Sequence, residues 1–189
     1  MTTIGTPPVA TPHQYLVRER RAEYKAEYHD GEIHAMAGAS RAHNRIVFRL
    51  VALLEPVLRE RGCEGYAGDM RVRVGLRDAY FYPDVVVACG EPRFEDGETD
   101  TLLNPTLVVE VVSPSTERFD RAAKGEMYRR LPSLVQYVLV SQGERRVEWY
   151  TRQEGGMWLF ARAEGPDAAV ALDAVGCTLR LAELYEGVL

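Results

Sequence analysis

The chain has 189 residues, of which 46% are hydrophobic and 27% are charged, and its formal net charge is −5. This length is typical of a single domain, and the composition excludes a largely disordered chain. No apolar run reaches the roughly 18 residues that a membrane span requires. The acidic balance excludes a protein that binds nucleic acid mainly through its overall charge, because such proteins are usually basic.

The three cysteines, Cys63, Cys89 and Cys177, lie far apart in the sequence and form no CxxC motif. We therefore expect neither a disulfide scaffold nor a cysteine-based zinc site. A small, odd number of cysteines is typical of proteins in a reducing compartment. The first residues have neither a basic start nor an apolar core, so they lack the features of a secretion signal. Together these features predict a cytoplasmic protein.

The first 40 residues predict a helix followed by a hairpin. Residues 1–12 contain three prolines and are expected to form a flexible lead-in. A charged surface helix is expected from about His13 to Glu27. The Asp30-Gly31 pair that follows lies between two short β-like pieces, which predicts a hairpin turn.

The clearest helix covers residues 40–62. Its apolar residues recur with the i, i+3, i+4, i+7 spacing of an amphipathic helix. Ser40 is a candidate N-cap, because its hydroxyl can accept a hydrogen bond from a free backbone N–H. Gly62 is suited to end the helix, because glycine adopts the left-handed conformation at little cost.

Strands dominate the rest of the sequence. Residues 70–74 alternate in polarity and predict a half-exposed strand, whereas the apolar runs 81–88 and 106–112 predict strands covered on both faces. The remaining expected elements are a helix from about Phe119 to Leu131, strands at 135–140, 145–151 and 157–163, and a closing strand with a helical turn. This order predicts one α/β domain over residues 13–189, with a central mixed β-sheet flanked by helices.

Two carboxylates stand in strongly apolar surroundings. Asp84 precedes the run VVVA, and Glu110 lies inside the run LVVEVV. A buried ionised carboxylate is very costly unless it has a cation, a metal ion or water as partner. If the two strands are neighbours, both acids can point into one cleft and hold Mg²⁺, which prefers oxygen ligands. Alternatively, Asp84 caps a turn after Pro83 and Glu110 pairs with an arginine.

A wider set of residues resembles a known family. Pro83-Asp84 is followed 26 residues later by Glu110, then by the sequence VVEVVSPST and a helix with Asp120 and Lys124. This ordered set resembles the PD-(D/E)XK nuclease superfamily, and more narrowly a bacterial group of restriction-endonuclease-like proteins. The resemblance covers most of the chain and implies a restriction-endonuclease-like fold.

The resemblance also implies roles for individual residues. Asp84 and Glu110 match the two acidic metal ligands of the superfamily, and the backbone carbonyl of Val111 matches a third ligand. Glu27 matches a further acid that this group places near the metal, with Glu32 as the competing choice.

One position departs from the superfamily pattern. The usual lysine follows the second acid by two residues, where this chain has Val112. In this group the lysine is expected on the next helix, which makes Lys124 the candidate. Lysine suits this role because its ammonium is a compact donor whose pKa responds to burial. The alternative is an ordinary helical ion pair between Asp120 and Lys124.

The resemblance implies a Mg²⁺- or Mn²⁺-dependent deoxyribonuclease that hydrolyses phosphodiester bonds. We expect double-stranded DNA as its partner, no membrane, and a homodimer, because one site per chain needs two copies to cut both strands. The alternative is a nuclease-like scaffold with degraded catalysis that binds protein or nucleic acid. A third hypothesis is a glycosidase with Asp84 and Glu110 as acid and base, which leaves Lys124 without a role.

Overall fold

The structure, a computed structural model, describes residues 10–75, 79–114 and 116–189. In this part of the chain the strands form three sheets, of six, five and two strands. The lead-in expected over residues 1–12 lies mostly outside the described residues, and Pro12 already begins the first helix. The predicted domain boundary therefore stays a prediction.

A mixed six-stranded sheet forms the centre of the molecule, with helices on both faces. Its strands are β3 (Cys63–Ala67), β6 (Val85–Cys89), β8 (Leu107–Val112), β9 (Gln136–Ser141), β10 (Arg146–Arg152) and β11 (Trp158–Glu164). The strand order is β11-β10-β9-β8-β6-β3, in which only β8 and β9 are parallel neighbours. The predicted α/β class is confirmed.

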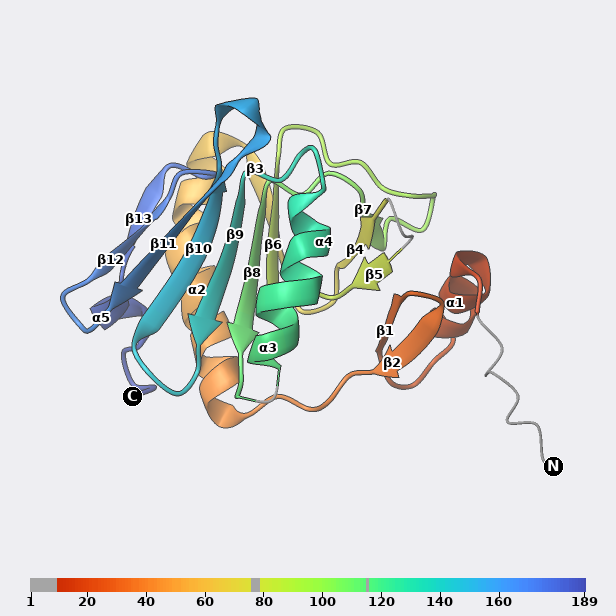
Figure 1. Ribbon diagram of the computed structural model, residues 1–189, viewed down its shortest axis with the longest axis horizontal. Helices are drawn as coiled ribbons and strands as arrows, with labels where there is room; N and C mark the ends of the chain where they lie inside the picture. The colour runs from red at the N-terminus through yellow and green to blue at the C-terminus, as the bar shows by residue number, and fades with distance from the viewer. Residues whose placement is uncertain (1–9, 76–78, 115) are drawn as a thin grey trace.

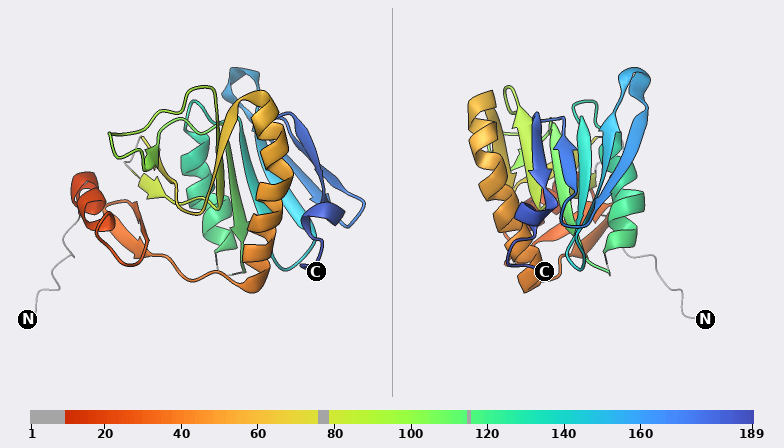
Figure 2. Two further views of the ribbon diagram at one scale, coloured as in Figure 1. Left: turned by 180° about the vertical axis from the view of Figure 1, so that it is seen from behind. Right: turned by 90° about the vertical axis from the view of Figure 1, so that its left-hand side faces the viewer.

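The two faces of this sheet carry different helices, as Figures 1 and 2 show. One face carries the long helix α2 (Arg41–Arg61). The other carries a continuous helical segment made of α3 (Glu117–Phe119), the π-helical turn η1 (Asp120–Lys124) and α4 (Gly125–Arg129).

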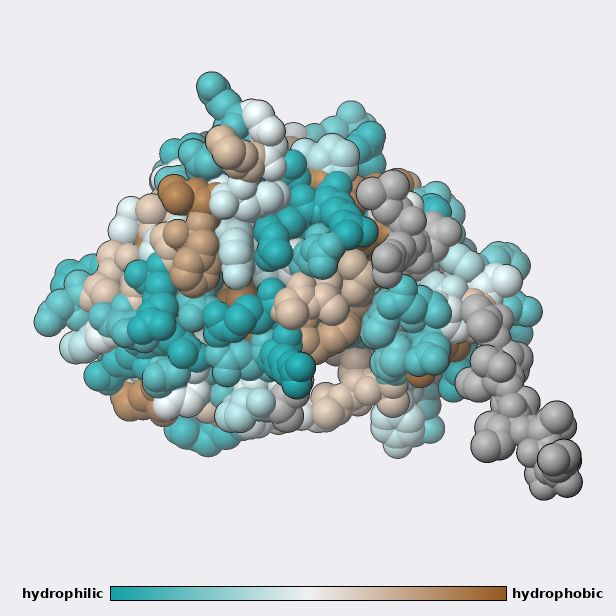
Figure 3. Space-filling model, viewed as in Figure 1, coloured by the Kyte–Doolittle hydropathy of each residue, from teal (hydrophilic) through white to brown (hydrophobic). Residues whose placement is uncertain are grey.

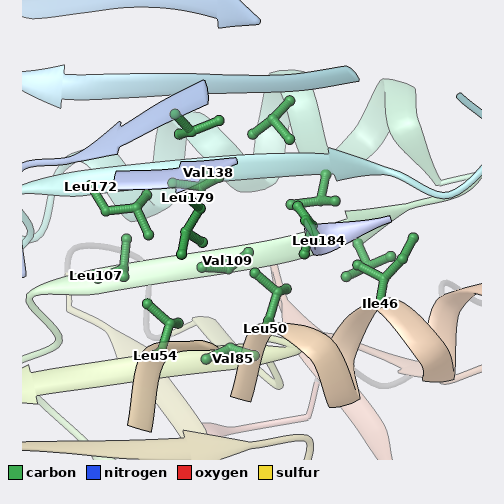
Figure 4. Packing of buried hydrophobic residues seen from close by; sticks show 14 of the residues in the cluster. Ile46, Leu50, Leu54, Val85, Leu107, Val109, Val138, Leu172, Leu179 and Leu184 are labelled. Atoms are coloured by element: carbon green, nitrogen blue, oxygen red, sulfur yellow. The ribbon is translucent and has the colours of Figure 1, made fainter. Parts of the chain in front are cut away.

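Helix α2 begins and ends where the sequence predicts. The Ser40 side chain accepts a hydrogen bond from the His43 N–H, and Gly62 closes the helix with a left-handed φ of 64°. Its buried stripe includes Leu50 and Leu54, which pack on Val85 and Val109 of the main sheet (Figure 4). This face of α2 therefore anchors the helix and fixes the place of its N-terminus beside β6.

A second sheet of short strands lies beside the main sheet. Its strands are β1 (Ala26–His29), β2 (Glu32–Ala35), β4 (Arg71–Val74), β5 (Ala79–Phe81) and β7 (Thr101–Leu102), in the order β2-β1-β5-β4-β7. Helix α1 (Pro12–Glu19) joins this sheet through Tyr15, whose ring stacks on Tyr28. Figure 1 shows this unit beside the helical segment, and Phe81 of β5 contacts Phe119 of α3.

The C-terminal elements pack on the face of the main sheet that also carries α2. After η2 (Glu154–Gly156), it contains β12 (Ala169–Leu172), β13 (Cys177–Arg180) and α5 (Leu181–Leu184). Leu172, Leu179 and Leu184 join the apolar cluster under α2. The face seen in Figure 1 is largely hydrophilic, with apolar areas near the β10–β11 side of the sheet (Figure 3).

Several predicted boundaries are wrong. The first helix ends at Glu19 rather than near Glu27, because the residues that follow pair with β2 and form β1. The run 81–88 is not one strand: Pro83, which has no N–H for a ladder, separates β5 from β6, and the two lie in different sheets. The strand predicted at 70–74 is mostly buried rather than half-exposed. The sequence patterns also missed β3, β7 and β12.

Cys63 and Cys89 form a disulfide between β3 and β6, which corrects the expectation from the cysteine count. The two residues are direct partners in the antiparallel register, a relation that sequence spacing does not reveal. The cysteines therefore give no support for a reducing compartment, and the cytoplasmic location stays a prediction. No helix among the described residues is long and apolar enough to cross a membrane.

Candidate active site

Four acidic side chains and one lysine meet where β1, β6, β8 and the helical segment approach one another. We call Glu27, Asp84, Glu110, Asp120 and Lys124 the acid cluster. Lys124 Nζ lies 2.8 Å from Glu27 Oε1, 2.9 Å from Glu110 Oε1 and 3.8 Å from Asp120 Oδ1. The structure thus brings together residues from three separate elements around one ammonium group.

The register of the main sheet places Asp84 beside Glu110. β6 and β8 pair with Val85 opposite Val109, so continuing the register by one residue sets Asp84 opposite Glu110. Opposed residues of an antiparallel pair point to the same face. That face carries the helical segment with Lys124, whereas Val85 and Val109 point to α2.

The Asp84 carboxylate is held by a donor on each oxygen. Oδ2 accepts a hydrogen bond of 2.7 Å from the Val111 N–H, and Oδ1 lies 2.9 Å from His43 Nε2. His43 comes from the first turn of α2, next to the Ser40 cap. This fixed orientation is inconsistent with the alternative in which Asp84 serves only as a turn cap.

The backbone of Val111 faces the acid cluster. Its N–H points to Asp84, whereas the next carbonyl, that of Val112, points the opposite way and accepts from Gln142. In a strand, the N–H and the carbonyl of one residue point to the same neighbouring strand, and those of the next residue point the other way. The Val111 carbonyl therefore points toward the same side as its N–H, the side of Asp84. The Val112 side chain packs in an apolar cluster and leaves the usual lysine position without a charge.

Glu27 joins the cluster, and its competitor Glu32 does not. Glu27 Oε1 accepts hydrogen bonds from Lys124 and from the Tyr82 N–H, at 2.8 and 3.1 Å. Glu32 lies on β2 with its side chain 65% exposed, near His34. The structure therefore places Glu27, and not Glu32, in the acid cluster.

The acid cluster holds one ammonium among four carboxyl groups. Burial disfavours the charged form of Lys124, but the attraction of Glu110, Glu27 and Asp120 outweighs this effect and raises its pKa. Burial raises the pKa of Glu110 well above its ordinary value, and the neighbouring carboxylates add to the rise while Lys124 opposes it. Burial also raises the pKa of Asp120. The lysine stays charged, and its single positive charge does not balance the four carboxyl groups.

Asp84 and His43 form the accessible side of the site. Their side chains are 20% and 18% exposed, whereas those of Lys124 and Glu110 are only 5% and 6% exposed. A cavity of about 430 Å³ elsewhere, lined in part by Arg73 and Leu131, contains no residue of the acid cluster. A ligand would therefore approach the cluster from the Asp84 side.

Comparison with known proteins places the chain in a family. The family model Uma2, described as "Putative restriction endonuclease", matches residues 12–182. The chain belongs to the Uma2 family. Two proteins of Synechocystis sp. PCC 6803 are similar to it: the uncharacterized protein sll1609 is 38% identical over 90% of this chain and 96% of its own length, and slr1290 is 36% identical over 95% and 93%.

A solved structure shares the fold of this Uma2 protein. It is the crystal structure of "a putative nuclease belonging to DUF820" from Anabaena variabilis, with a TM-score of 0.76 and 20% sequence identity. The match covers 95% of this chain and 99% of that one. The predicted resemblance to restriction-endonuclease-like nucleases is therefore confirmed for family and fold.

The donors in the Uma2 acid cluster fit a hard divalent cation. Asp84, Glu110 and the Val111 carbonyl supply only oxygen, which Mg²⁺ prefers. Glu110 Oε1 is buried and makes no hydrogen bond among the described residues, although Lys124 Nζ lies 2.9 Å away as an ion-pair partner. No three His, Cys, Asp or Glu side chains in the described part of the chain are grouped to hold a metal by themselves. The set of two carboxylates and one carbonyl does not require such a group.

Sequence reasoning left two neighbours of this site without a role. His43 stands alone near the start of a helix, where a histidine is more often structural, and its contact with Asp84 depends on how α2 packs. Asp120 was visible as a helical partner of Lys124, and the structure adds its burial beside Glu27 and Glu110. In both cases the contact arises from tertiary packing, which local sequence patterns do not show.

Proposed function

We propose that this Uma2 protein is a Mg²⁺- or Mn²⁺-dependent endonuclease that hydrolyses phosphodiester bonds in DNA. The observation that carries the proposal is the pairing of Asp84 with Glu110 on adjacent strands, with the Lys124 ammonium 2.9 Å from Glu110. Two acids and a lysine that reach one point from separate elements are costly to bury, and a role in catalysis accounts for them.

Asp84, Glu110 and the Val111 carbonyl would hold the ion. When bound, a divalent ion neutralises phosphate oxygens, lowers the pKa of a bound water and stabilises the leaving oxygen. His43 and the Val111 N–H keep the Asp84 carboxylate in one orientation, so that little ordering remains to be done when the ion binds.

Lys124 would act on the attacking water and the phosphate. Its ammonium can donate three hydrogen bonds, of which the one to Glu27 is already directed. A further donor direction is available to orient water and to offset charge that develops on the phosphate in the transition state. Glu27 holds the ammonium in place from the side of the small sheet.

The charge of the acid cluster favours a fixed order of binding. Four carboxyl groups face one ammonium, so the cluster by itself repels a phosphodiester. Bound metal would reverse this repulsion, and we expect DNA to bind productively only after the ion. Double-strand cleavage requires a second active site, so we also propose a homodimer.

Nicking of supercoiled plasmid tests the proposal. The wild type is expected to nick DNA with Mg²⁺ or Mn²⁺ and to stop when the metal is chelated. Asp84→Asn and Glu110→Gln keep the side-chain shape and should lose activity on the order of 100-fold or more. Glu32→Gln, in the hairpin that also carries Glu27 but exposed, is the matched control and should retain activity.

The same assay separates the alternatives. Equal nicking by Asp84→Asn and the wild type would assign the activity to a contaminant. Metal binding without cleavage of any nucleic acid would favour the degraded scaffold. Hydrolysis of a glycoside without added metal would favour the glycosidase hypothesis.

A further inference from the structure

Lys124 lies at the end of a π-helical turn inside an otherwise α-helical segment. The turn covers Asp120–Lys124, and the Gly125 N–H donates to the Asp120 carbonyl five residues earlier. Both ends of the turn carry buried, charged side chains, Asp120 and Lys124, which lie in the acid cluster. Single π-turns inside α-helices often occur at functional sites.

Gly125 is the residue that this turn requires. A Cβ at this position would lie 2.8 Å from the Asp120 carbonyl oxygen and 2.8 Å from Cε1 of the Tyr137 ring. The first of these contacts is with backbone and cannot be relieved by a side-chain rotation. Any larger residue must therefore push the turn away from β9.

Tyr137 ties the turn to the sheet. Its hydroxyl donates a hydrogen bond of 2.9 Å to the same Asp120 carbonyl that accepts from Gly125. Tyr137 lies on β9 opposite Val108 of β8, two residues before Glu110. The strands that position Glu110 therefore also position the turn that carries Lys124.

We propose that Tyr137 and Gly125 are positioning residues that hold the π-turn and thereby deliver the Lys124 ammonium to Glu110. An α-helix turns by about 100° per residue, so removing the extra residue of the π-turn would rotate one side of the segment relative to the other by about that angle. Lys124 and Asp120 would then no longer point together into the acid cluster. The consequence for catalysis rests on the proposed nuclease function, whereas the placement of Lys124 does not.

Two neighbouring tyrosines provide a matched test. Tyr137 and Tyr128 are both fully buried, with ring centroids 5.5 Å apart, but the Tyr128 hydroxyl has no hydrogen-bond partner among the described residues. Tyr137→Phe removes the bond to Asp120, and Tyr128→Phe removes a hydroxyl of the same kind that makes no hydrogen bond to the described residues. The two variants lose the same atom from adjacent places in the core.

The readout uses the fact that Lys25 and Lys124 are the only lysines of the chain. In protein labelled with ¹³C at lysine Cε, two NMR signals are expected, and Lys25→Arg assigns them. Tyr137→Phe should shift or broaden the Lys124 signal and lower the rate of plasmid nicking by about 10-fold to 100-fold, because the ammonium is misplaced. Tyr128→Phe should leave both signals and the nicking rate unchanged.

The outcomes separate this proposal from the nuclease function. A Lys124 signal that Tyr137→Phe leaves in place, or that Tyr128→Phe shifts equally, overturns the positioning role. A shift specific to Tyr137→Phe in a protein that cuts no DNA supports the positioning role and contradicts the nuclease function. Gly125→Ala should displace the same signal further; a folded Gly125→Ala protein with the wild-type Lys124 signal would overturn the role of Gly125.

Discussion

Two groups of charged side chains in this protein differ in how their charges are balanced. In the first, which we call the arginine cluster, Arg20 and Arg71 face Asp96 and Asp100. Arg71 Nη2 lies 2.5 Å from Asp100, and Arg20 bridges Asp100 and Asp96 at 2.9 and 2.8 Å. Each arginine there has a carboxylate. The acid cluster instead gives four carboxyl groups a single lysine.

The pKa values of the two groups shift in opposite directions. Hydrogen bonds from Arg20 lead the effects that lower the pKa of Asp100, whereas burial raises the pKa of Glu110. In the arginine cluster the positive and negative charges balance one another, and their ion pairs connect α1, β4 and the loop before β7. An unbalanced cluster is completed only by added positive charge, such as a proton or a metal ion. This difference separates a structural group of charges from a candidate active site.

Removing the lysine should give the largest effect. Lys124→Met removes the lysine of the acid cluster, and we expect nicking to fall by on the order of 1,000-fold, measured as initial rate with Mn²⁺. Urea unfolding should show a loss of about 3 kcal/mol, since a buried ion pair is broken on one side. Lys25→Met is the control, because Lys25 pairs with the exposed Asp69 outside the acid cluster. Equal losses in both variants would contradict a special role for Lys124.

Breaking the arginine cluster should affect stability but not activity. Asp100→Asn removes the carboxylate shared by Arg20 and Arg71, at an expected cost of about 2 kcal/mol at pH 7. Because the folded-state pKa of Asp100 is lowered, its stabilisation is present above its ordinary pKa of 3.8 and is lost as the pH falls below it. Urea titrations from pH 7 to pH 3 should therefore show a flatter acid decline for the variant. A large loss of nicking under conditions where the variant is folded would erase the distinction between the clusters.

Loosening Asp84 should weaken metal binding. His43→Ala removes one of the two donors on the Asp84 carboxylate, and partners of this kind usually change metal affinity by about 10-fold to 100-fold. Calorimetric titration with Mn²⁺ measures the change. His34→Ala is the control, because His34 lies on β2 beside Glu32. Unchanged affinity in His43→Ala would show that the contact with Asp84 does not matter for the ion.

The smallest effect concerns Glu110 in the metal-free protein. Its folded-state pKa is raised, so its ionisation costs stability as the pH rises above the ordinary value of 4.5. Glu110→Gln removes this cost and should stabilise the metal-free protein at pH 8 by on the order of 1 kcal/mol. Thermal unfolding with chelator measures this, and added Mg²⁺ should reverse the order by stabilising only the wild type. A variant that is less stable than the wild type with chelator would contradict the charge imbalance.

Local patterns predicted the elements whose ends and faces are set within one segment. Ser40 and Gly62 mark the ends of α2 because capping depends on nearby residues. The apolar run that ends at Val112 predicts a central strand because both faces of this strand carry mostly apolar side chains. The pairing of Cys63 with Cys89 and the change of sheet at Pro83 depend on register between distant strands, which local patterns do not contain.

The same limit applies to the site. Asp84 and Glu110 were visible because each carboxylate interrupts or precedes an apolar run. Lys124 was selected by resemblance, since its local context also fitted an ordinary pair with Asp120. The contact of His43 with Asp84 depends on tertiary packing, because it requires the N-terminus of α2 to lie at the end of β6.

Mn²⁺ binding by the acid cluster decides whether Asp84 and Glu110 hold a divalent ion. Mn²⁺ is titrated into the wild type and into the double variant Asp84→Asn/Glu110→Gln, with binding followed by calorimetry and folding verified for both. The wild type is expected to bind Mn²⁺ at a site that the double variant loses. Equal Mn²⁺ affinity in the two proteins, or no binding by a folded wild type, would contradict this expectation.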